Sequence, residues 1–230
     1  MPKNEHIHKI DDFYKLVFPK IKPITDRTFL EGSKGDFVEQ KPFIDIETFA
    51  TNLGITDIQR IPPEIVVDGK PIYYIKHAVL IGTTIFLNIN DSSEKQRFSI
   101  AHEIFEFLFR KKNDDGLKAV ARQGEAWKTQ NAEDKKAISE ILIDYFAANL
   151  LVPTERFILF EDKSNEEIAL EFGLEPRCIE IRREEVEHEL DLMVPLNLSS
   201  DDEAEEQRPA SLDELDHILE VHSIHDSGRF

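Results

Sequence analysis

Two nearly apolar stretches of the chain, residues 98–110 and 138–152, each carry a narrow polar stripe with helical spacing. The first stripe consists of side chains three or four positions apart, which share one side of a helix: Ser99, His102, Glu103, Glu106 and Arg110. The second consists of Glu140 and Asp144, one turn apart, in a helix that Pro153 closes. Because a helix that is apolar around most of its circumference is normally buried, we expect both stripes to face one internal cleft.

The first stripe also has an ordinary interpretation. Glu106 and Arg110 have the spacing of a helical i,i+4 ion pair, and amphipathic helices with a solvated polar stripe are common. The second stripe makes this ordinary interpretation less favoured, because several carboxylates in a cleft of low dielectric either take up protons or hold a cation. A bound divalent metal is the simpler resolution.

Residues 102–106 read His-Glu-x-x-Glu, one residue away from the zinc-peptidase signature His-Glu-x-x-His. His102 and Glu106 point the same way on a helix and can bind one cation between them. Glu103 lies where a general base for a metal-bound water is placed in such sites.

Two blocks of the sequence together resemble the ImmA/IrrE family of metallo-endopeptidases. The first block runs from Ile85 to Asn90 and continues through residues 96–103, and the second is Glu140 followed, six residues later, by Phe-Ala-Ala-Asn-Leu-Leu-Val-Pro at 146–153. The residues of the two blocks, their order and their spacing all agree with the family.

The resemblance implies a zincin-like metallopeptidase core in which His102 and Glu140 are metal ligands and Glu103 is the catalytic base. Glu106 stands at the position of the second ligand, where the family has histidine. By the same resemblance we expect zinc as the cofactor, while a ligand set rich in carboxylate oxygens makes manganese the alternative.

Glutamate at position 106 changes the electronics of such a site. Carboxylate oxygens at about 2.0–2.2 Å are accepted zinc ligands, so coordination by Glu106 is chemically sound. The net charge of the centre falls from plus one to zero, and such a centre polarises a carbonyl less, which predicts a slower peptidase and a shift of preference toward manganese. The alternative is a degenerate site kept for its shape, which is a pseudopeptidase.

Further candidates lie near the motif. Asp144 is expected behind a metal ligand or as an alternative ligand. His77, in a strand-like stretch, is an alternative second ligand, although a half-exposed packing histidine is the favoured interpretation. The family resemblance makes the strand at 86–90, with Asn88 and Asn90, the candidate that receives an extended substrate by strand addition, and an ordinary core strand is an equally good interpretation.

Composition restricts the class of protein. A chain of 230 residues with 40% hydrophobic content can bury one sizeable core. Its formal charge of -18 argues against a broad phosphate-binding surface, so direct nucleic-acid binding is not expected. A single cysteine, Cys178, rules out an internal disulfide framework. The N-terminus lacks an apolar signal core and no run is long enough to span a membrane, which predicts a cytoplasmic protein.

The expected fold class is α+β, with helices around a small antiparallel sheet and a helix-turn-helix-like segment after the core. Four regions are expected: an N-terminal helical region at 1–60, a metallopeptidase-like core at 61–160, a helix-turn-helix-like segment at 161–195 and an acidic tail with a short helix at 196–230. Helices are predicted at 11–18 and at 44–55, where Gly54 ends the second. Alternating Ile, Val, Tyr and Thr from 64 to 90 predict the sheet, with a turn at Asp68-Gly69.

The helix-turn-helix-like segment begins with a capping signal at Ser164 and has a glycine stop at Gly173. Its second helix mixes Arg177, Arg182 and Arg183 with four glutamates, which favours packing or protein contact over DNA binding. The resemblance implies a metal-dependent endopeptidase that cleaves a helix-turn-helix repressor to release stress, phage or mobile-element genes. The competing interpretation is a pseudopeptidase that binds such a regulator or a toxin-antitoxin-like partner.

Overall fold

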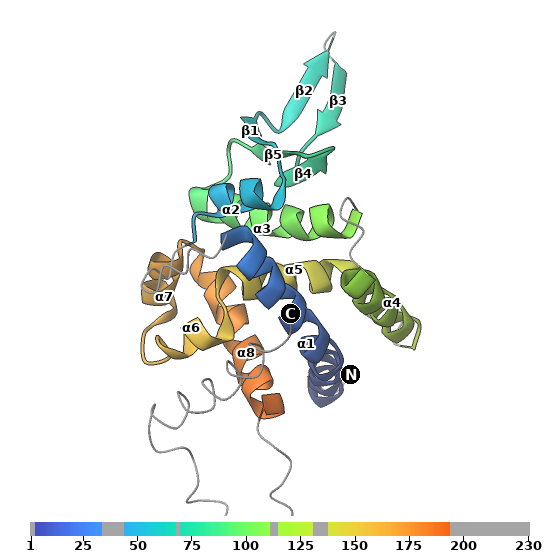
Figure 1. Cartoon of the computed structure of the whole chain (residues 1–230), viewed down its shortest axis with the longest axis vertical. Coiled ribbons are helices and arrows are strands. Elements are labelled where there is room, and N and C mark those ends of the chain that lie inside the picture. Colours follow the sequence, from blue (N-terminus) through green and yellow to red (C-terminus); the bar gives the residue numbers. More distant parts are fainter. Residues whose placement is uncertain (1–2, 34–43, 68–69, 111–114, 131–137, 194–230) are drawn as a thin grey trace, which may run out of the picture. The chain divides into compact units, whose positions relative to one another are not determined.

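The structure is a computed structural model that describes residues 3–33, 44–67, 70–110, 115–130 and 138–193 (Figure 1). Its contacts divide the chain into a unit of residues 1–193 and a unit of residues 194–230. The predicted acidic tail lies outside the described residues, and the predicted region boundaries near residues 60 and 160 fall within the first unit, so these stay predictions.

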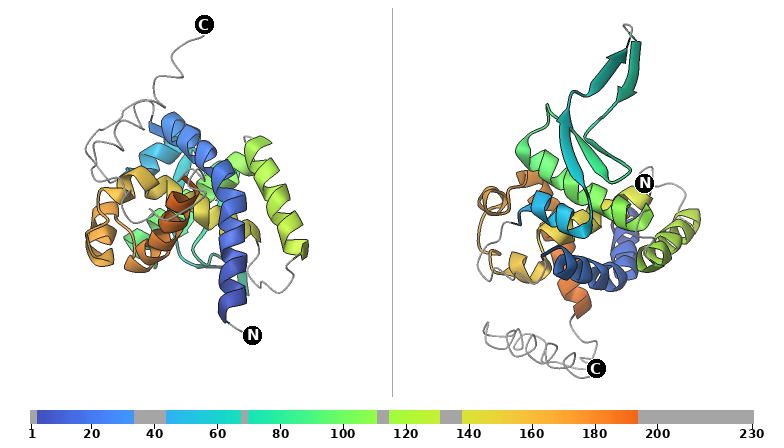
Figure 2. Two further views of the ribbon diagram at one scale, coloured as in Figure 1. Left: turned by 90° about the horizontal axis from the view of Figure 1, so that it is seen from below. Right: turned by 45° about the horizontal axis from the view of Figure 1, so that its top comes forward.

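Helix α3 (Ser93–Arg110) lies between the sheet on one side and helix α5 (Ile138–Leu151) on the other (Figures 1 and 2). These are the two helices that carry the polar stripes. An edge-to-face contact between Phe105 and Phe146, with ring centroids 5.4 Å apart, joins them, and such pairs contribute about 0.5–1.5 kcal/mol beyond their buried area. The expected pairing of the two motif helices in the core is confirmed.

The main sheet has the strand order β1-β5-β4, formed by β1 (Asp57–Ile61), β4 (Ala78–Ile81) and β5 (Thr84–Asn88). Strand β4 runs antiparallel to β5, and their turn contains Gly82 with φ 66°. Strand β1 runs parallel to β5. The α+β class is therefore confirmed, while the sheet is mixed and not purely antiparallel as expected.

Strands β2 (Glu64–Val67) and β3 (Lys70–Tyr74) explain this difference. They form a separate antiparallel pair, which projects from the rest of the unit (Figures 1 and 2). The predicted turn at residues 68–69 lies outside the described residues. This pair follows β1 in the sequence but takes no part in the main sheet, so β1 pairs with the more distant β5. Alternation along the chain does not reveal this pairing, because the pairing depends on contacts between distant segments.

Helix α1 (Lys3–Ser33) is much longer than the predicted helix at 11–18 and continues through Pro19 and Pro23. A proline inside a helix removes a backbone hydrogen bond and crowds the preceding turn. Buried side chains at helical spacing offset that cost, because this part of α1 packs four of them into the core: Val17, Phe18, Ile21 and Ile24.

Helix α2 (Ile46–Leu53) ends where the sequence predicts. Asp45 caps its start by accepting a hydrogen bond from the Thr48 backbone N–H, and Gly54 ends it with φ 106°. Both are local signals.

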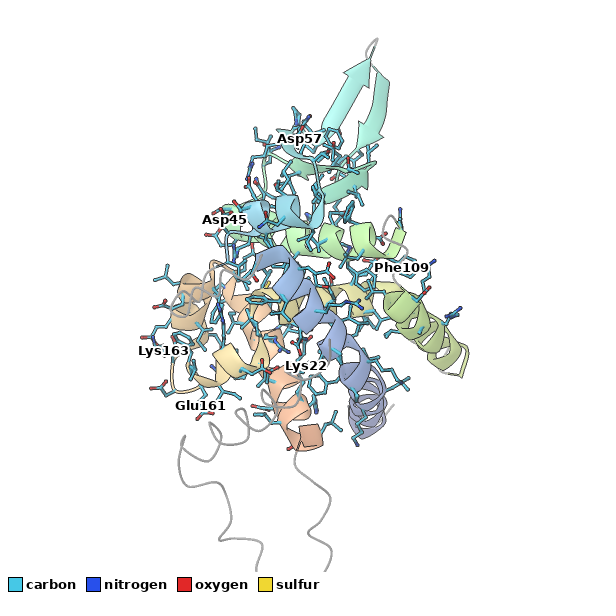
Figure 3. All side chains as sticks on the ribbon, viewed as in Figure 1. Lys22, Asp45, Asp57, Phe109, Glu161 and Lys163 are labelled. Atoms are coloured by element: carbon cyan, nitrogen blue, oxygen red, sulfur yellow. The ribbon has the colours of Figure 1, made fainter. Side chains whose placement is uncertain are left out.

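The remaining helices are α4 (Asp115–Gln130), α6 (Thr154–Ile158), α7 (Asn165–Phe172) and α8 (Pro176–Met193). Helix α7 begins with a capping box between Ser164 and Glu167 and ends at Gly173 with φ 63°, as the sequence predicts. Of these helices, α4 and α8 pack against α1, and Figure 3 shows the side chains that the helices carry. No helix among those described is both long and apolar enough to cross a membrane.

Candidate functional site

The polar stripe of α3 is largely withdrawn from solvent. Ser99 and Glu103 are buried, each with 8% of its surface exposed, and His102 and Glu106 are half-buried. This follows from the position of α3 between the sheet and α5, since a helix enclosed on two sides has little surface left for water. The polar stripe of α3 is therefore not fully solvated.

His102 faces α5 through Asp144. The distance from His102 Nδ1 to Asp144 Oδ1 is 3.4 Å, which brings together two residues that are distant in the sequence. Burial lowers the pKa of His102, but the hydrogen bond to Asp144 and the charges of Glu103, Asp144 and Glu140 outweigh it, so that its pKa is raised. A carboxylate at Nδ1 fixes the tautomer that leaves Nε2 as a ligand atom.

Glu103 is the most perturbed acid of the stripe. Burial raises its pKa to about 7, and the neighbouring charge of Glu106 adds to this effect. The charge of His102 and a hydrogen bond from the Leu80 backbone N–H act in the opposite direction. A carboxyl group that titrates near neutral pH can both accept and return a proton, which is the property of a general base.

Glu106 forms the i,i+4 ion pair that its spacing predicts. Arg110 Nε lies against Glu106 Oε2, with 66% of the arginine side chain exposed but only 18% of the glutamate side chain. Glu106 Oε2 is buried and makes no hydrogen bond of acceptable geometry. The contact with Arg110 is therefore close but poorly directed. A buried, incompletely satisfied carboxylate oxygen thus lies one turn from His102.

Glu140 lies in the first turn of α5 and is exposed. Among the described residues, no three His, Cys, Asp or Glu side chains converge in the manner of a metal-ligand group. The donor chemistry nevertheless fits a divalent metal: one imidazole, carboxylates from two packed helices, and the unsatisfied oxygen of Glu106. The ligand roles of His102, Glu106 and Glu140 stay predictions.

The other candidates make different contacts. His77 lies in the bend between β3 and β4 and not in a strand, and its Nδ1 lies 3.0 Å from Asp91 Oδ2, just before α3. Asn88 is buried, donates to the Lys76 carbonyl at 3.0 Å and accepts from the Asn90 backbone N–H at 3.0 Å. These hydrogen bonds stabilise the backbone conformation at the end of β5.

The strand expected to receive a substrate is the central strand of its sheet. Strand β5 is paired with β1 on one side and with β4 on the other, which leaves no free edge at residues 84–88. The candidate substrate strand at 86–90, with Asn88 and Asn90, is thus corrected: β5 is a core strand, and the edges of this sheet belong to β1 and β4. Sequence could not show this, because strand order depends on pairing between distant segments.

A buried polar network between α5 and α8 was not foreseen. Arg182 is 1% exposed and Glu189 is 0% exposed, and the distance from Arg182 Nη1 to Glu189 Oε1 is 2.7 Å. Tyr145 donates to Glu189 at 2.6 Å, and Arg182 donates to Asn149 at 3.0 Å. The available signal was spacing, because the inward positions of α8 follow one another at three or four residues: Ile179, Arg182, Val186 and Glu189.

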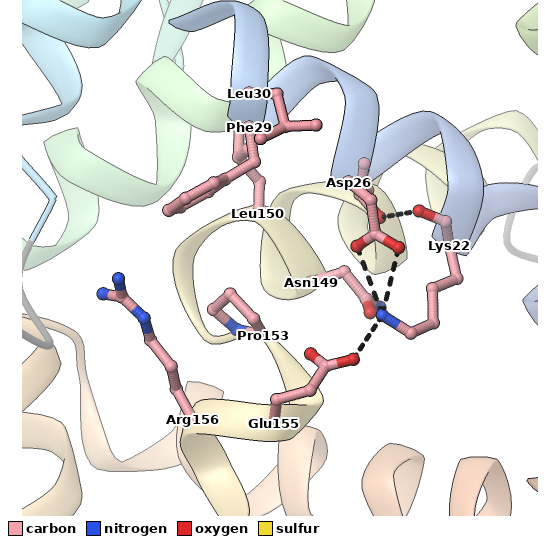
Figure 4. Close-up of a pocket in the computed structure, with 10 residues that line it drawn as sticks. Lys22, Asp26, Phe29, Leu30, Asn149, Leu150, Pro153, Glu155 and Arg156 are labelled. Atoms are coloured by element: carbon pink, nitrogen blue, oxygen red, sulfur yellow. Dashed lines mark hydrogen bonds and ion pairs between the residues drawn. The ribbon is translucent and has the colours of Figure 1, made fainter. Parts of the chain in front are cut away.

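A cavity of about 320 Å³ lies between α1, α5 and α6, apart from the motif (Figure 4). Phe29, Leu150 and Pro153 supply apolar lining. Lys22 Nζ lies 2.6 Å from Glu155 and 3.2 Å from Asp26, so the charges on this wall compensate one another. None of the candidate metal or catalytic residues lines it.

An α+β fold with a buried acid beside a helix-borne histidine is compatible with a metallopeptidase-like protein. A family model described as the IrrE N-terminal-like domain of a peptidase family matches residues 65–183, more than half of the chain. The chain belongs to this family, which is zincin-like, and family membership implies a peptidase and a metal. A search of curated proteins finds no match.

Proposed function

We propose that this chain is a metal-dependent endopeptidase that cleaves a helix-turn-helix repressor. The observation that carries the proposal is the geometry of α3, where the buried Glu103 adjoins His102 and His102 Nδ1 lies 3.4 Å from Asp144 Oδ1 of α5. Family membership supports the peptidase class, and the sequence resemblance suggests the kind of substrate. The cytoplasmic location is a prediction of the sequence.

Each residue has a defined part in this proposal. His102, Glu106 and Glu140 hold the metal, zinc or manganese, and Asp144 orients the His102 ring from behind. A bound divalent metal would polarise the peptide carbonyl and make a water easier to deprotonate. Glu103 accepts the proton of the attacking water and returns it to the leaving amine, which requires a pKa close to neutral.

One observation favours a second candidate function. The engagement of Glu106 by Arg110, with no convergent group of three ligands among the described side chains, suits a pseudopeptidase that binds a regulator without cleaving it. In that case the cleft recognises its partner, while Glu103 has no catalytic role.

Mass spectrometry of protein N-termini separates the two functions, and it does so even while the substrate is unidentified. Cells that produce the native chain should contain a few new N-termini within helix-turn-helix repressors, and cells that produce Glu103→Gln should not. The substitution keeps the size of the side chain and removes the base, so we expect a loss of at least about 100-fold in cleavage. Chelation of divalent metals in a lysate should have the same effect.

Glu106→His provides the complementary control. Because it restores the histidine of the signature, it should increase cleavage if the scaffold is intact and the second ligand limits the rate. Cleavage that persists in the Glu103→Gln chain would contradict the assigned base. An absence of new N-termini with both the native chain and Glu106→His would contradict the endopeptidase and leave the binding function.

A further inference from the structure

Arg110 is an unusual neighbour for a metal ligand. It lies one turn after Glu106 on α3, at the solvent-facing end of the polar stripe, and its Nε lies against Glu106 Oε2. The described part of the chain gives Glu106 no other charged partner within ion-pair distance. The carboxylate that should serve as the second ligand is therefore already engaged by a cation that belongs to the protein.

The burial of the two partners is unequal. The Arg110 side chain is 66% exposed and can move into water at little cost, whereas only 18% of the Glu106 side chain is exposed. A half-buried carboxylate needs a positive partner, because desolvation without one is unfavourable. Either the guanidinium or a divalent cation can supply that charge.

The contact geometry indicates which partner is the temporary one. The approach of Arg110 Nε to Glu106 Oε2 is close but poorly directed, so Oε2 lacks a proper hydrogen bond although it is buried. The geometry of an intrahelical pair is limited by the spacing of its two residues on one helix, whereas a metal ion is not attached to the helix and can adopt the direction that coordination requires. The ion pair is thus a weaker arrangement than coordination would be.

We propose that Arg110 competes with the metal for Glu106, so that a cation must displace the guanidinium from the carboxylate before the site is complete. This inference rests on the proposed function, because it requires that Glu106 is a metal ligand. It assigns to Arg110 the control of metal affinity, a role that the signature does not contain. The exposed end of the Arg110 side chain allows it to leave without disturbing the core.

The test is a measurement of zinc affinity by competition with a chromophoric chelator, on chains that carry no histidine tag. Arg110→Gln should tighten zinc binding about three- to tenfold, since the competing ion pair is lost. The matched control is Arg177→Gln, which removes the same charge from another exposed intrahelical pair, with Arg177 Nη1 2.5 Å from Glu180 Oε2 on α8. That substitution should leave the affinity unchanged.

Nuclear magnetic resonance distinguishes competition from a simple change of charge. The Nε chemical shift of Arg110 should differ from that of a solvated arginine in the metal-free native chain and should move to the solvated value at saturating zinc. An Arg110 Nε shift that stays unchanged with zinc bound would show that Arg110 and the metal share Glu106, which overturns the proposal.

The outcomes also separate this inference from the proposed function. Equal zinc affinity of the native chain, Arg110→Gln and Arg177→Gln would overturn the competition and leave the metal site in place. If neither the native chain nor Arg110→Gln binds zinc or manganese, the metal-dependent function and the competition are both refuted.

Discussion

The imidazole of His102 lies against a carboxylate of another helix, and this contact controls its protonation. Burial alone would lower the pKa of His102, but Asp144 and the nearby glutamates reverse the effect and raise it. A raised histidine pKa adds stability that is fully present below the unfolded pKa and is lost as the pH rises through the folded pKa. At the residue scale, the proton of His102 is therefore coupled to the packing of α3 against α5.

Asp144→Asn should lower the pKa of His102 in the metal-free protein, because the imidazolium loses its anionic partner. The variant should also lose stability relative to the native chain at acidic pH, where His102 is charged, and less at pH 8. Titration of the histidine ring protons by nuclear magnetic resonance measures the first effect and urea unfolding measures the second.

Asp91→Asn is the control for this prediction. It removes a carboxylate from another paired histidine, His77, and should leave the His102 titration unchanged. A His102 pKa that is equal in the native chain and in Asp144→Asn would show that the 3.4 Å contact does not influence protonation.

At the scale of elements, the packing of α8 on α5 depends on buried charge. The single guanidinium of Arg182 faces two carboxylates, with Glu185 Oε2 at 3.3 Å and Glu189 Oε1 at 2.7 Å. One positive charge cannot compensate both. Burial raises the pKa of Glu189, but the charge of Arg182 and the hydrogen bonds from Arg182, Thr154 and Tyr145 outweigh burial and lower the pKa. For Glu185 burial dominates and raises the pKa to about 8.

Glu185→Gln should make the protein less sensitive to alkaline pH. Between the unfolded pKa of Glu185, near 4.5, and its folded pKa of about 8, the native chain keeps a proton that the unfolded chain releases. Stability therefore falls as the pH rises through this range, by up to about 1.4 kcal/mol per pH unit. Glutamine stays neutral, so the variant should gain stability relative to the native chain at pH 8, by roughly 1–3 kcal/mol, compared with pH 5.

Urea unfolding at the two pH values measures this difference, and Glu184→Gln is the matched control. Glu184 is the exposed neighbour of Glu185 on α8, so its substitution should change the pH dependence little. The change in stability between pH 5 and pH 8 should be compared in the native chain and in Glu185→Gln. A larger rise in the native chain than in the variant would contradict the protonated state of Glu185.

At the scale of the whole molecule, charge decides which large partners are accessible. The formal charge of -18 repels a phosphate backbone, and the arginines of α8 do not form a free basic surface. Arg182 is buried, and Arg183 donates to the Glu161 and Lys163 carbonyls and to Asn165. Arg177 is exposed but forms an ion pair with Glu180. The α7–α8 pair thus resembles a helix-turn-helix in order, while its second helix has arginines that are buried or already engaged by acceptors within the protein.

We therefore predict that the full chain does not bind duplex DNA at about 150 mM salt. Fluorescence anisotropy with a labelled duplex of random sequence measures this. Binding that weakens steeply as salt increases would contradict the prediction, because that dependence indicates phosphate contacts.

The features that the sequence determined are local. Gly54 and Gly173 end their helices, Ser164 caps α7, and the stripes on α3 and α5 follow from helical spacing. In each case the residues that decide the outcome lie within about one or two helical turns, and capping and periodicity are properties of that range. The ion pair of Glu106 with Arg110 belongs to the same group, since its spacing alone predicts it.

Only the tertiary structure decided the pairings between distant segments. The central position of β5, the contact of His102 with Asp144 and the burial of Arg182 each depend on which elements meet, and each joins residues far apart in the chain. Such contacts are selected by the packing of the whole core, so the burial or solvation of a polar residue is set by elements outside its own stretch of sequence. The sequence by itself therefore determined which groups are present for metal chemistry, and the packing of α3 between the sheet and α5 decided which of them are buried, paired or free to move.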